Sequence, residues 1–312
     1  MEGRRVVLCA LLFLGACSRA PEPFTPVLEK LGLPGGHESV RFAVLGDTGT
    51  GTQRQRDIAA RAVEYREEFA FDFVLMLGDN LYGREQAEDF ERKFSLPYKV
   101  LLDDGVEFYA VLGNHDNRSQ RFFAPFHMNG QSYYTFRKGS VRFFGLESDY
   151  MTPEQLAWLD EELADAGEDW KICFMHHPLY SSGATHGPSL ELRRVLEPLF
   201  VRYAVDVVFA GHEHSYERQR PQQGVTYFVA GASAKLSPGN VRGNAATAAS
   251  YDRDNSFLLV EVDNESLWFR AVSRTGAIVD SGVITHPAGV SAAEQSGDEG
   301  DASRSVHRGT GP

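Results

Sequence analysis

The sequence has only three cysteines in 312 residues, too few to build a disulfide framework. It also has no apolar run near the roughly 20 residues that a membrane-spanning helix needs. Positive charge is in the minority, because 31 Lys and Arg stand against 43 Asp and Glu, which gives a formal net charge of −12. This balance argues against a protein that binds the phosphate backbone of nucleic acids, since such binding needs a basic surface.

The rest of the composition is that of an ordinary globular protein. Hydrophobic residues make up 42% of the chain, aromatic residues 12% and charged residues 24%. This is enough apolar material for one large core or two small ones. An acidic protein of this kind can still act on an anionic substrate, provided that something local supplies positive charge.

The first 18 residues have the layout of an export signal. Arg4 and Arg5 precede a short apolar segment, which is too short to span a membrane. The segment ends in Leu14-Gly15-Ala16-Cys17, which resembles the lipobox of bacterial lipoproteins. The resemblance implies that residues 1–16 are a signal peptide and that Cys17 is acylated and becomes the mature N-terminus. Acyl chains would then anchor the protein to a membrane.

Two alternatives to this interpretation stay open. The segment could be an ordinary cleaved signal that contains Cys17, and the paired arginines also resemble part of a twin-arginine export signal. The lipoprotein interpretation predicts a protein at the periplasmic face of a bacterial membrane or at the cell surface. Ser18 is not the Asp that commonly retains bacterial lipoproteins at the inner membrane, so the outer membrane is favoured.

Composition also predicts the limits of the folded domain. Residues 17–38 are rich in Pro and Gly and indicate a flexible tether, and residues 288–312 have almost no large apolar side chains and indicate a disordered tail. A single domain is therefore expected over residues 39–287. Cys173 lies inside an apolar run of this domain and is expected to be a buried, inert thiol.

Five apolar runs of strand character each end in a polar residue. Between the runs, apolar residues recur at helical spacing, and Thr152-Pro153-Glu154-Gln155 has the pattern of a helix start, so we expect an α/β core. In such sheets the ligand sites lie beyond the carboxyl ends of the strands, so five polar strand ends predict one convergent site. The runs are 41–45, 71–77, 108–112, 172–175 and 205–210, and the polar residues after them are Asp47, Asp79, Asn114, His176 and His212.

These residues lie in five ordered motifs that resemble one protein family. The chain is similar to the calcineurin-like metallophosphoesterases and, more narrowly, to the small purple acid phosphatases of the tartrate-resistant type, over about half its length. The resemblance implies an α/β fold, a four-layer α/β/β/α metallophosphoesterase sandwich of two mixed β-sheets flanked by helices. The motifs are Gly46-Asp47-Thr48-Gly49, Gly78-Asp79-Asn80-Leu81-Tyr82, Gly113-Asn114-His115-Asp116, Met175-His176-His177-Pro178 and Gly211-His212-Glu213-His214.

The resemblance also implies a centre of two metal ions that Asp79 bridges. Carboxylate and phenolate oxygens are hard ligands that suit a ferric ion, whereas imidazole and amide ligands suit Fe2+, Zn2+ or Mn2+. A shared carboxylate gives the ~3.5–4 Å metal separation of two-metal phosphoesterases. The family pattern assigns Asp47, Asp79, Tyr82 and His214 to Fe3+, and Asp79, Asn114, His176 and His212 to the divalent ion.

One exchange of residues separates this chain from most calcineurin-like phosphoesterases. Those proteins have a His two residues after the first Asp, and this chain has Gly49, which cannot bind a metal. A ligand reappears as Tyr82, three residues after Asp79. In the purple acid phosphatases a phenolate–Fe3+ bond of this kind gives the colour, so the exchange favours that subfamily.

Three further residues match family positions that act on the substrate. His115 follows Asn114 and is expected to contact the phosphate, and Asp116 is expected to orient it. His186, in Thr185-His186-Gly187-Pro188, matches the second substrate-binding histidine of the family. His177 is expected to pack in the wall of the site. Which of His115 and His186 is the general acid stays open.

The predicted reaction is hydrolysis of a small phosphate monoester at acid pH, in which a metal-bound hydroxide attacks phosphorus. Whether that hydroxide is bridging or terminal stays open. The alternatives are a phosphodiesterase or nucleotidase on the same scaffold, and a non-catalytic surface lipoprotein that binds metal or phosphate; redox chemistry at the metal pair is secondary. We expect a monomer that binds the membrane through its lipid anchor and does not bind nucleic acid.

Overall fold

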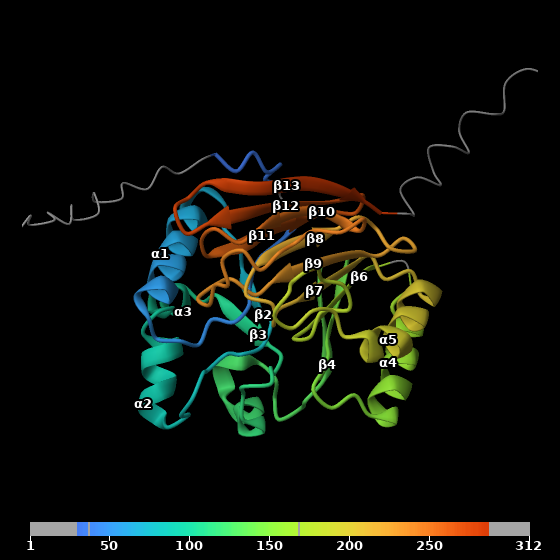
Figure 1. Ribbon diagram of the computed structural model, residues 1–312, viewed down its shortest axis with the longest axis horizontal. Helices are drawn as coiled ribbons and strands as arrows, with labels where there is room; N and C mark the ends of the chain where they lie inside the picture. Colours follow the sequence, from blue (N-terminus) through green and yellow to red (C-terminus); the bar gives the residue numbers. More distant parts are fainter. Residues whose placement is uncertain (1–29, 37, 168, 287–312) are drawn as a thin grey trace, which may run out of the picture.

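Two β-sheets lie face to face between two groups of helices in the computed structural model, which describes residues 30–36, 38–167 and 169–286 (Figure 1). The longer helices are α1 (Gln53–Glu68), α4 (Pro153–Asp165) and α5 (Leu190–Arg202), and the shorter ones are α2 (Ala87–Phe90), the π-helical η1 (Glu91–Ser95), α3 (Lys99–Asp103) and the 3-10 turns η2 (Arg118–Phe122) and η3 (Ala124–Phe126). The strands are β1 (Val40–Leu45), β2 (Phe73–Met76), β3 (Glu107–Ala110), β4 (Tyr134–Lys138), β5 (Val141–Gly145), β6 (Trp170–Met175), β7 (Val207–Ala210), β8 (Tyr216–Gln219), β9 (Thr226–Ala230), β10 (Thr247–Tyr251), β11 (Ser256–Val262), β12 (Ser266–Ser273) and β13 (Ile278–Thr285).

Both sheets mix parallel and antiparallel pairs. The first has the order β13-β12-β11-β1-β2-β3, and β1, β2 and β3 are parallel to one another. The second has the order β10-β8-β9-β7-β6-β5-β4, and β5, β6, β7 and β9 are parallel. Parallel neighbours end at the same edge of a sheet, so the loops after β1, β2 and β3 lie together, as do the loops after β6 and β7.

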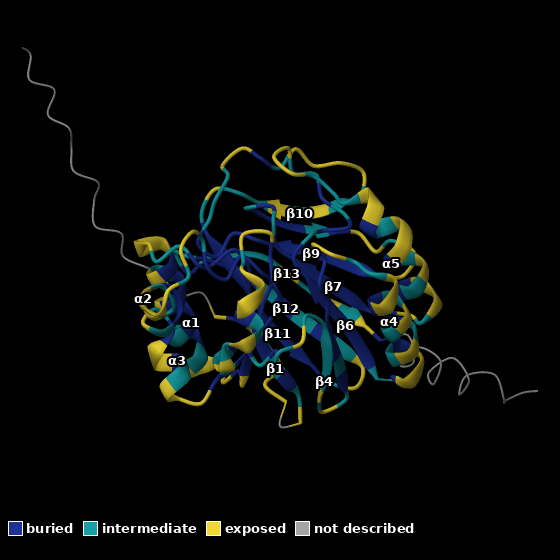
Figure 2. Ribbon diagram, turned by 90° about the horizontal axis from the view of Figure 1, so that it is seen from below, coloured by how far each residue is buried: buried dark blue, intermediate teal, exposed yellow. Residues whose placement is uncertain are grey.

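Side chains that alternate along the strands form three apolar layers: one between the two sheets and one between each sheet and its helices. Helices, sheet, sheet and helices therefore make a four-layer sandwich. On β1, Ala43 and Leu45 face α1, while Phe42 and Val44 face the other sheet. In the second sheet Cys173 packs toward α4 and α5. Figure 2 shows most of the strands buried, the edge strand β10 largely exposed, and the outer faces of the helices exposed, so the predicted fold class is confirmed.

The five strands predicted to carry the site are all present, with ends that differ by one or two residues from the apolar runs. The predicted helix start is also confirmed, because Thr152 accepts a hydrogen bond from the backbone N–H of Gln155 at 3.2 Å. The buried Gln155 side chain bonds to the backbone of Glu147 and so ties α4 to the loop after β5. Cys173 is buried and free, and burial raises its pKa.

The packed chain begins earlier than the sequence predicts. Leu31 is 2% exposed and packs in the apolar cluster between α1 and the first sheet. Its carbonyl accepts a hydrogen bond from Arg270 at 2.6 Å. The part of the predicted tether from residue 30 to 36 therefore packs on the domain. The predicted signal peptide, Cys17 and the predicted tail lie outside the described residues. Over the described chain, no helix has the length and apolar character needed to cross a membrane.

Candidate metal centre

Loops that follow parallel strands bring the predicted ligands together. Asp47 and Asp79 follow β1 and β2 in one sheet, and His176 follows β6 in the other. The potential ligand atoms of these three residues lie within 4.8 Å of one another. The convergent site that the strand ends predict is therefore present where the two sheets meet.

Three of the predicted ligands have left-handed backbone conformations. The φ angles are 57° at Asp47, 51° at Asp79 and 70° at His212. Such angles are uncommon for residues with a side chain and cluster at functional sites, although Asp and His adopt them more readily than most. The backbone turns at His212 after β7 ends, and the His212 N–H donates a hydrogen bond to the Asp47 carboxylate at 2.9 Å.

Tyr82 forms one side of the site with Asp47 and His214. Its hydroxyl oxygen lies 3.0 Å from Asp47 Oδ1 and 3.4 Å from His214 Nε2. His214 Nε2 is itself 3.5 Å from the same carboxylate oxygen. A phenol, a carboxylate and an imidazole therefore present their donor atoms to one small volume, and their predicted binding of a ferric ion stays a prediction.

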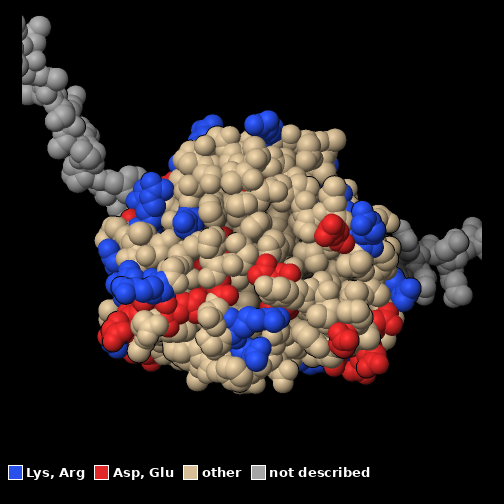
Figure 3. All heavy atoms as spheres, turned by 60° about the horizontal axis from the view of Figure 1, so that its bottom comes forward, with Lys and Arg blue, Asp and Glu red and all other residues tan. Residues whose placement is uncertain are grey.

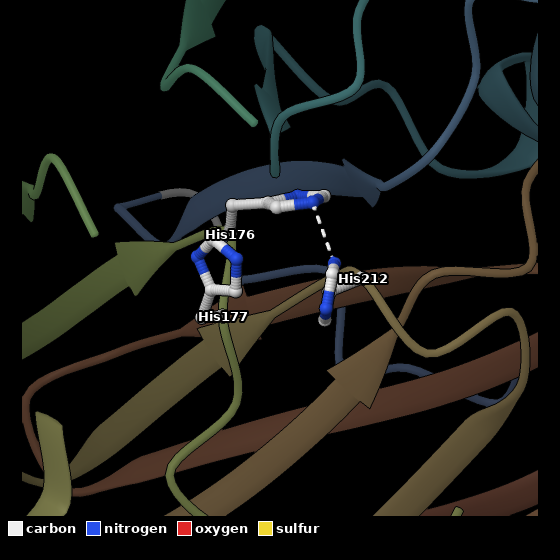
Figure 4. Close-up of side chains that lie close together, drawn as sticks. All are labelled: His176, His177 and His212. Carbon is white, nitrogen blue, oxygen red and sulfur yellow. Dashed lines mark hydrogen bonds between the residues drawn. The ribbon is translucent and has the colours of Figure 1, made fainter. Parts of the chain in front are cut away.

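His176 forms the other side with Asn114, His212 and Asp79. Its Nε2 lies 3.0 Å from Asn114 Oδ1, 3.1 Å from His212 Nδ1 and 3.5 Å from Asp79 Oδ1. Its Nδ1 lies 2.8 Å from the carbonyl of Leu77, to which it can donate, and this tautomer leaves the Nε2 lone pair facing the site. Figure 4 shows the rings of His176 and His212 directed at each other and His177 beside them.

The residues of the site fit two bound cations. Asp47 is 0% exposed and Asp79 is 1% exposed, and within the described part of the chain neither forms an ion pair with Lys or Arg. Buried carboxylates without a cation are costly, so the arrangement needs positive charge from elsewhere. Burial, followed by the charges of Asp47 and Asp79, raises the pKa of Tyr82 far above its usual range, so a phenolate here also needs a cation.

Gly49 and Tyr82 are linked by direct packing. The Gly49 N–H donates to the carbonyl of Asp79 at 3.2 Å, and the Tyr82 N–H donates to the carbonyl of Gly49 at 2.9 Å. A Cβ at position 49 would lie 2.0 Å from the carbonyl oxygen of Asn80. The loop that carries Tyr82 therefore occupies the space that a side chain at position 49 would need. The absence of a histidine at position 49 and the presence of the predicted ligand Tyr82 thus have one geometric cause.

Asp116 connects the loops that follow β2 and β3. Its carboxylate accepts hydrogen bonds from the backbone N–H groups of Asn80, Leu81 and Gly113 at 2.9–3.0 Å, and from the side chain of Gln120 at 2.8 Å. Burial and the charge of Asp79 raise its pKa. These bonds fix the peptide groups next to Asp79, while the predicted role of orienting His115 stays a prediction.

The two predicted substrate histidines flank the centre from different loops. The ring of His115 lies 5.0 Å from the ring of Tyr82, and the ring of His186 lies 4.1 Å from that of His212, measured between centroids. Both residues are exposed, so their rings are accessible to a substrate. The segment that contains His186 thus lies beside His212, and its predicted role in binding the substrate stays a prediction.

Two more residues lie beside the site: His177, which the sequence predicts in its wall, and Lys235, which the sequence does not predict. A potential ligand atom of His177 lies within 4.8 Å of those of His176 and His212, and burial, then the charge of His176, lowers the pKa of His177 to about 4. The ammonium group of Lys235 lies 4.2 Å from the centre of the Tyr82 ring. Lys235 is far away in the sequence and belongs to no motif, so only the folded chain brings it to the phenol.

The chain belongs to the calcineurin-like phosphoesterase family, whose model matches residues 40–216. Within that class it is similar to human tartrate-resistant acid phosphatase type 5, with 28% identity over 260 residues that cover 68% of this chain and 79% of the relative. Its fold is similar to that of purple acid phosphatase PPD1 from yellow lupin, with a TM-score of 0.68, 18% identity, and coverage of 81% of this chain and 55% of that one. It is also similar to GAP50, described as the anchor in the inner membrane complex of Plasmodium, with a TM-score of 0.71, 18% identity, and coverage of 88% and 99%.

Proposed function

We propose that the protein is an exported, lipid-anchored acid phosphatase that hydrolyses phosphate monoesters with a pair of metal ions. The observation that carries this proposal is the phenol of Tyr82, 3.0 Å from Asp47 and 3.4 Å from His214, on the opposite side of the site from the His176 group. A hard, anionic ligand set beside a set of imidazole and amide ligands suits a ferric ion next to a divalent ion. The divalent ion would be Fe2+, Zn2+ or Mn2+.

Asp79 would hold both ions, because its carboxylate lies near His176 on one side and its charge acts on Tyr82 on the other. Bound metal ions in such sites neutralise charge on the phosphoryl group and supply a nucleophile from water. The protein's own contribution is to fix the ligand geometry through the bonds of Asp116 and through the carbonyl of Leu77. His115 and His186 would bind the phosphate, and one of them would donate a proton to the leaving alkoxide.

The place of action is part of the proposal. The lipobox-like segment that ends in Cys17 supports acylation and attachment to a bacterial membrane, and the centre would then act on substrates outside the cytoplasm. On the face drawn in Figure 3, Lys and Arg side chains occur in small separate groups among acidic ones. A broad basic surface is what nucleic-acid binding would need on that face. Cys17→Ser should abolish incorporation of labelled palmitate, and incorporation that persists would contradict the anchor.

The central test is elemental analysis together with the visible spectrum of the purified protein. The wild type should contain two metal ions and show a phenolate–iron band, and Tyr82→Phe should lose the band while keeping the fold. Tyr251→Phe, on β10, is the matched control and should keep the colour. Two bound metals without any visible band would contradict the ferric assignment. Asp79→Asn should disrupt the metal pair and lower the metal content.

Substrate class is tested with p-nitrophenyl phosphate and its bis ester at pH 5 and pH 8. The proposal expects the monoester at pH 5 to be the better substrate. Preference for the diester at pH 8 would instead favour a phosphodiesterase on the same scaffold. Bound metal without turnover of either ester would favour a non-catalytic lipoprotein.

A further inference from the structure

Glu213 lies between the predicted ligands His212 and His214 in the sequence, but its carboxylate forms hydrogen bonds with the loop that contains His186. The residue is 0% exposed. Its Oε1 accepts hydrogen bonds from two successive backbone N–H groups, that of His186 at 2.7 Å and that of Gly187 at 2.5 Å. Hydrogen bonds from backbone N–H groups to an ionised carboxylate are charge-assisted and roughly twice as strong as neutral ones, so they hold the loop backbone firmly.

The second oxygen of the same carboxylate reaches Asn240. Oε2 accepts a hydrogen bond from Asn240 Nδ2 at 2.5 Å. Asn240 Oδ1 in turn accepts from the backbone N–H of Ala184 at 3.0 Å and from the hydroxyl of Thr185 at 2.7 Å. Glu213 and Asn240, which we call the Glu213–Asn240 clamp, therefore hold residues 184–187 from one side.

Close packing leaves this clamp little freedom to move. A Cβ at Gly183 would lie 2.3 Å from the carboxyl carbon of Glu213, so the loop backbone sits directly against the carboxylate. Gly183 also forms a β-bridge with Val241. The carboxylate is thus enclosed by the loop whose amides it binds.

The loop held in this way carries His186, whose side chain is exposed. The ring of His186 lies 4.1 Å from that of His212 and 5.9 Å from that of His214. Exposed loops are mobile unless their backbone is held, and an unfixed loop would spread the imidazole over many positions. A proton donor acts efficiently only when it is held within hydrogen-bond reach of the substrate.

We propose that Glu213 is a positioning residue that holds His186 over the metal centre, so that its imidazole meets the phosphate ester in one orientation. The segment His212-Glu213-His214 then has two functions: its histidines face the metal ions and its glutamate fixes the substrate-binding loop. This assignment rests on the proposed function, because the role of His186 does.

The first test measures the loop itself by amide hydrogen exchange on the metal-loaded protein. Glu213→Ala should strongly increase exchange in the peptide that contains His186 and Gly187. Glu261→Ala is the matched control, since Glu261 is also 0% exposed and accepts from the backbone N–H groups of Gly35 and Gly36. The control should leave exchange at His186 unchanged. Equal exchange at His186 in the wild type and Glu213→Ala would overturn the proposal.

The second test is a double-mutant cycle on kcat/KM for p-nitrophenyl phosphate. If Glu213 acts through His186, Glu213→Ala and His186→Ala should each lower kcat/KM by roughly 10²-fold, and the double variant should be no worse than His186→Ala within about threefold. Metal content and the visible band should stay those of the wild type. Losses that multiply in the double variant, or loss of metal in Glu213→Ala, would show a general structural role and refute the assignment.

Two milder variants keep the proposal testable if Glu213→Ala folds poorly. Glu213→Gln retains an oxygen for the His186 and Gly187 amides but sets its NH2 group against Asn240 Nδ2, so kcat/KM should lie between that of the wild type and that of Glu213→Ala. Gly183→Ala would bring a Cβ within 2.3 Å of the Glu213 carboxyl carbon, so it should displace the carboxylate and lower kcat/KM toward the value of His186→Ala. If the wild type has no phosphatase activity, the proposed function is contradicted. Slow amide exchange at His186 in that wild type, and faster exchange in Glu213→Ala, would still support the clamp.

Discussion

Substitution of Gly49 tests the geometric link between this glycine and Tyr82. In Gly49→Ala the new Cβ would lie 2.0 Å from Asn80 O and 2.4 Å from Leu81 Cα, whereas real Cβ atoms essentially never come closer than 3.0 Å. The Asn80–Leu81 backbone must therefore retreat by about 1 Å. Tyr82 lies on the same loop, so its phenol oxygen should move away from Asp47.

The size of the effect follows from this displacement. Overpacking of this kind costs about 1–3 kcal/mol, which corresponds to a fall in Tm of roughly 3–10 °C for a domain of this length. A misplacement of about 1 Å at a catalytic centre lowers kcat by up to roughly 10²-fold. If the protein holds iron as proposed, the phenolate–iron band should weaken or shift, because moving the Tyr82 phenol would distort the bond that produces the band.

Calorimetry, elemental analysis and the visible spectrum measure these effects together. Gly36→Ala is the control, since a Cβ there would meet Ser39 at an ordinary 3.6 Å. Gly49→His should behave like Gly49→Ala or worse, because its side chain is larger than a methyl group. A Gly49→Ala protein with the Tm, metal content and colour of the wild type would refute the reasoning.

Three further predictions concern stability and substrate choice. Asp116→Ala leaves the N–H groups of Asn80, Leu81 and Gly113 without their acceptor and should cost more than about 3 kcal/mol in urea unfolding, whereas Asp116→Asn should cost less. Thr152→Ala removes the acceptor at the start of α4 and should lower stability by about 1 kcal/mol without changing kcat. Asp149 and Glu191 line a cavity of about 500 Å3 beside His177, and their carboxylates should attract a cationic leaving group and repel an anionic one. 3-Aminopropyl phosphate should therefore be hydrolysed roughly tenfold more efficiently than 3-carboxypropyl phosphate, with n-butyl phosphate between them. Equal rates for the three esters would contradict this prediction.

The strands that carry the site could be predicted from the sequence because buried parallel strands are continuous apolar runs. β6 (Trp170–Met175) is buried at all six positions, and β7 (Val207–Ala210) at all four. Two strands at the edges of the sheets gave no such signal. β10 (Thr247–Tyr251) has no buried residue, and β13 (Ile278–Thr285) alternates between partly buried and exposed positions along the edge of its sheet. Their pairing depends on neighbours that lie far away in the sequence.

The same distinction separates the predicted and unpredicted parts of the site. Asp47, Asp79, Asn114, His176 and His212 could be predicted because each follows a strand end, and parallel strands fix where those ends meet. The roles of Glu213, Asp116 and Asn240 depend on how one loop packs on another. Spacing along the chain carries no information about such contacts, and Asn240 belongs to no motif at all.

The predicted ligands of the candidate metal centre are divided between the two sheets, and this has a consequence for the order in which the protein would mature. Asp47, Asp79, Tyr82 and Asn114 come from loops of the first sheet, while His176, His212 and His214 come from loops of the second. Neither sheet alone presents the complete predicted set for either proposed ion, so metal loading would have to follow docking of the sheets. By linkage, bound metal then stabilises that docking, by about 4 kcal/mol for each site at a metal concentration 1,000-fold above its Kd. A chelator present during refolding should therefore leave a protein whose two sheets separate more readily, and later addition of metal should restore their cohesion.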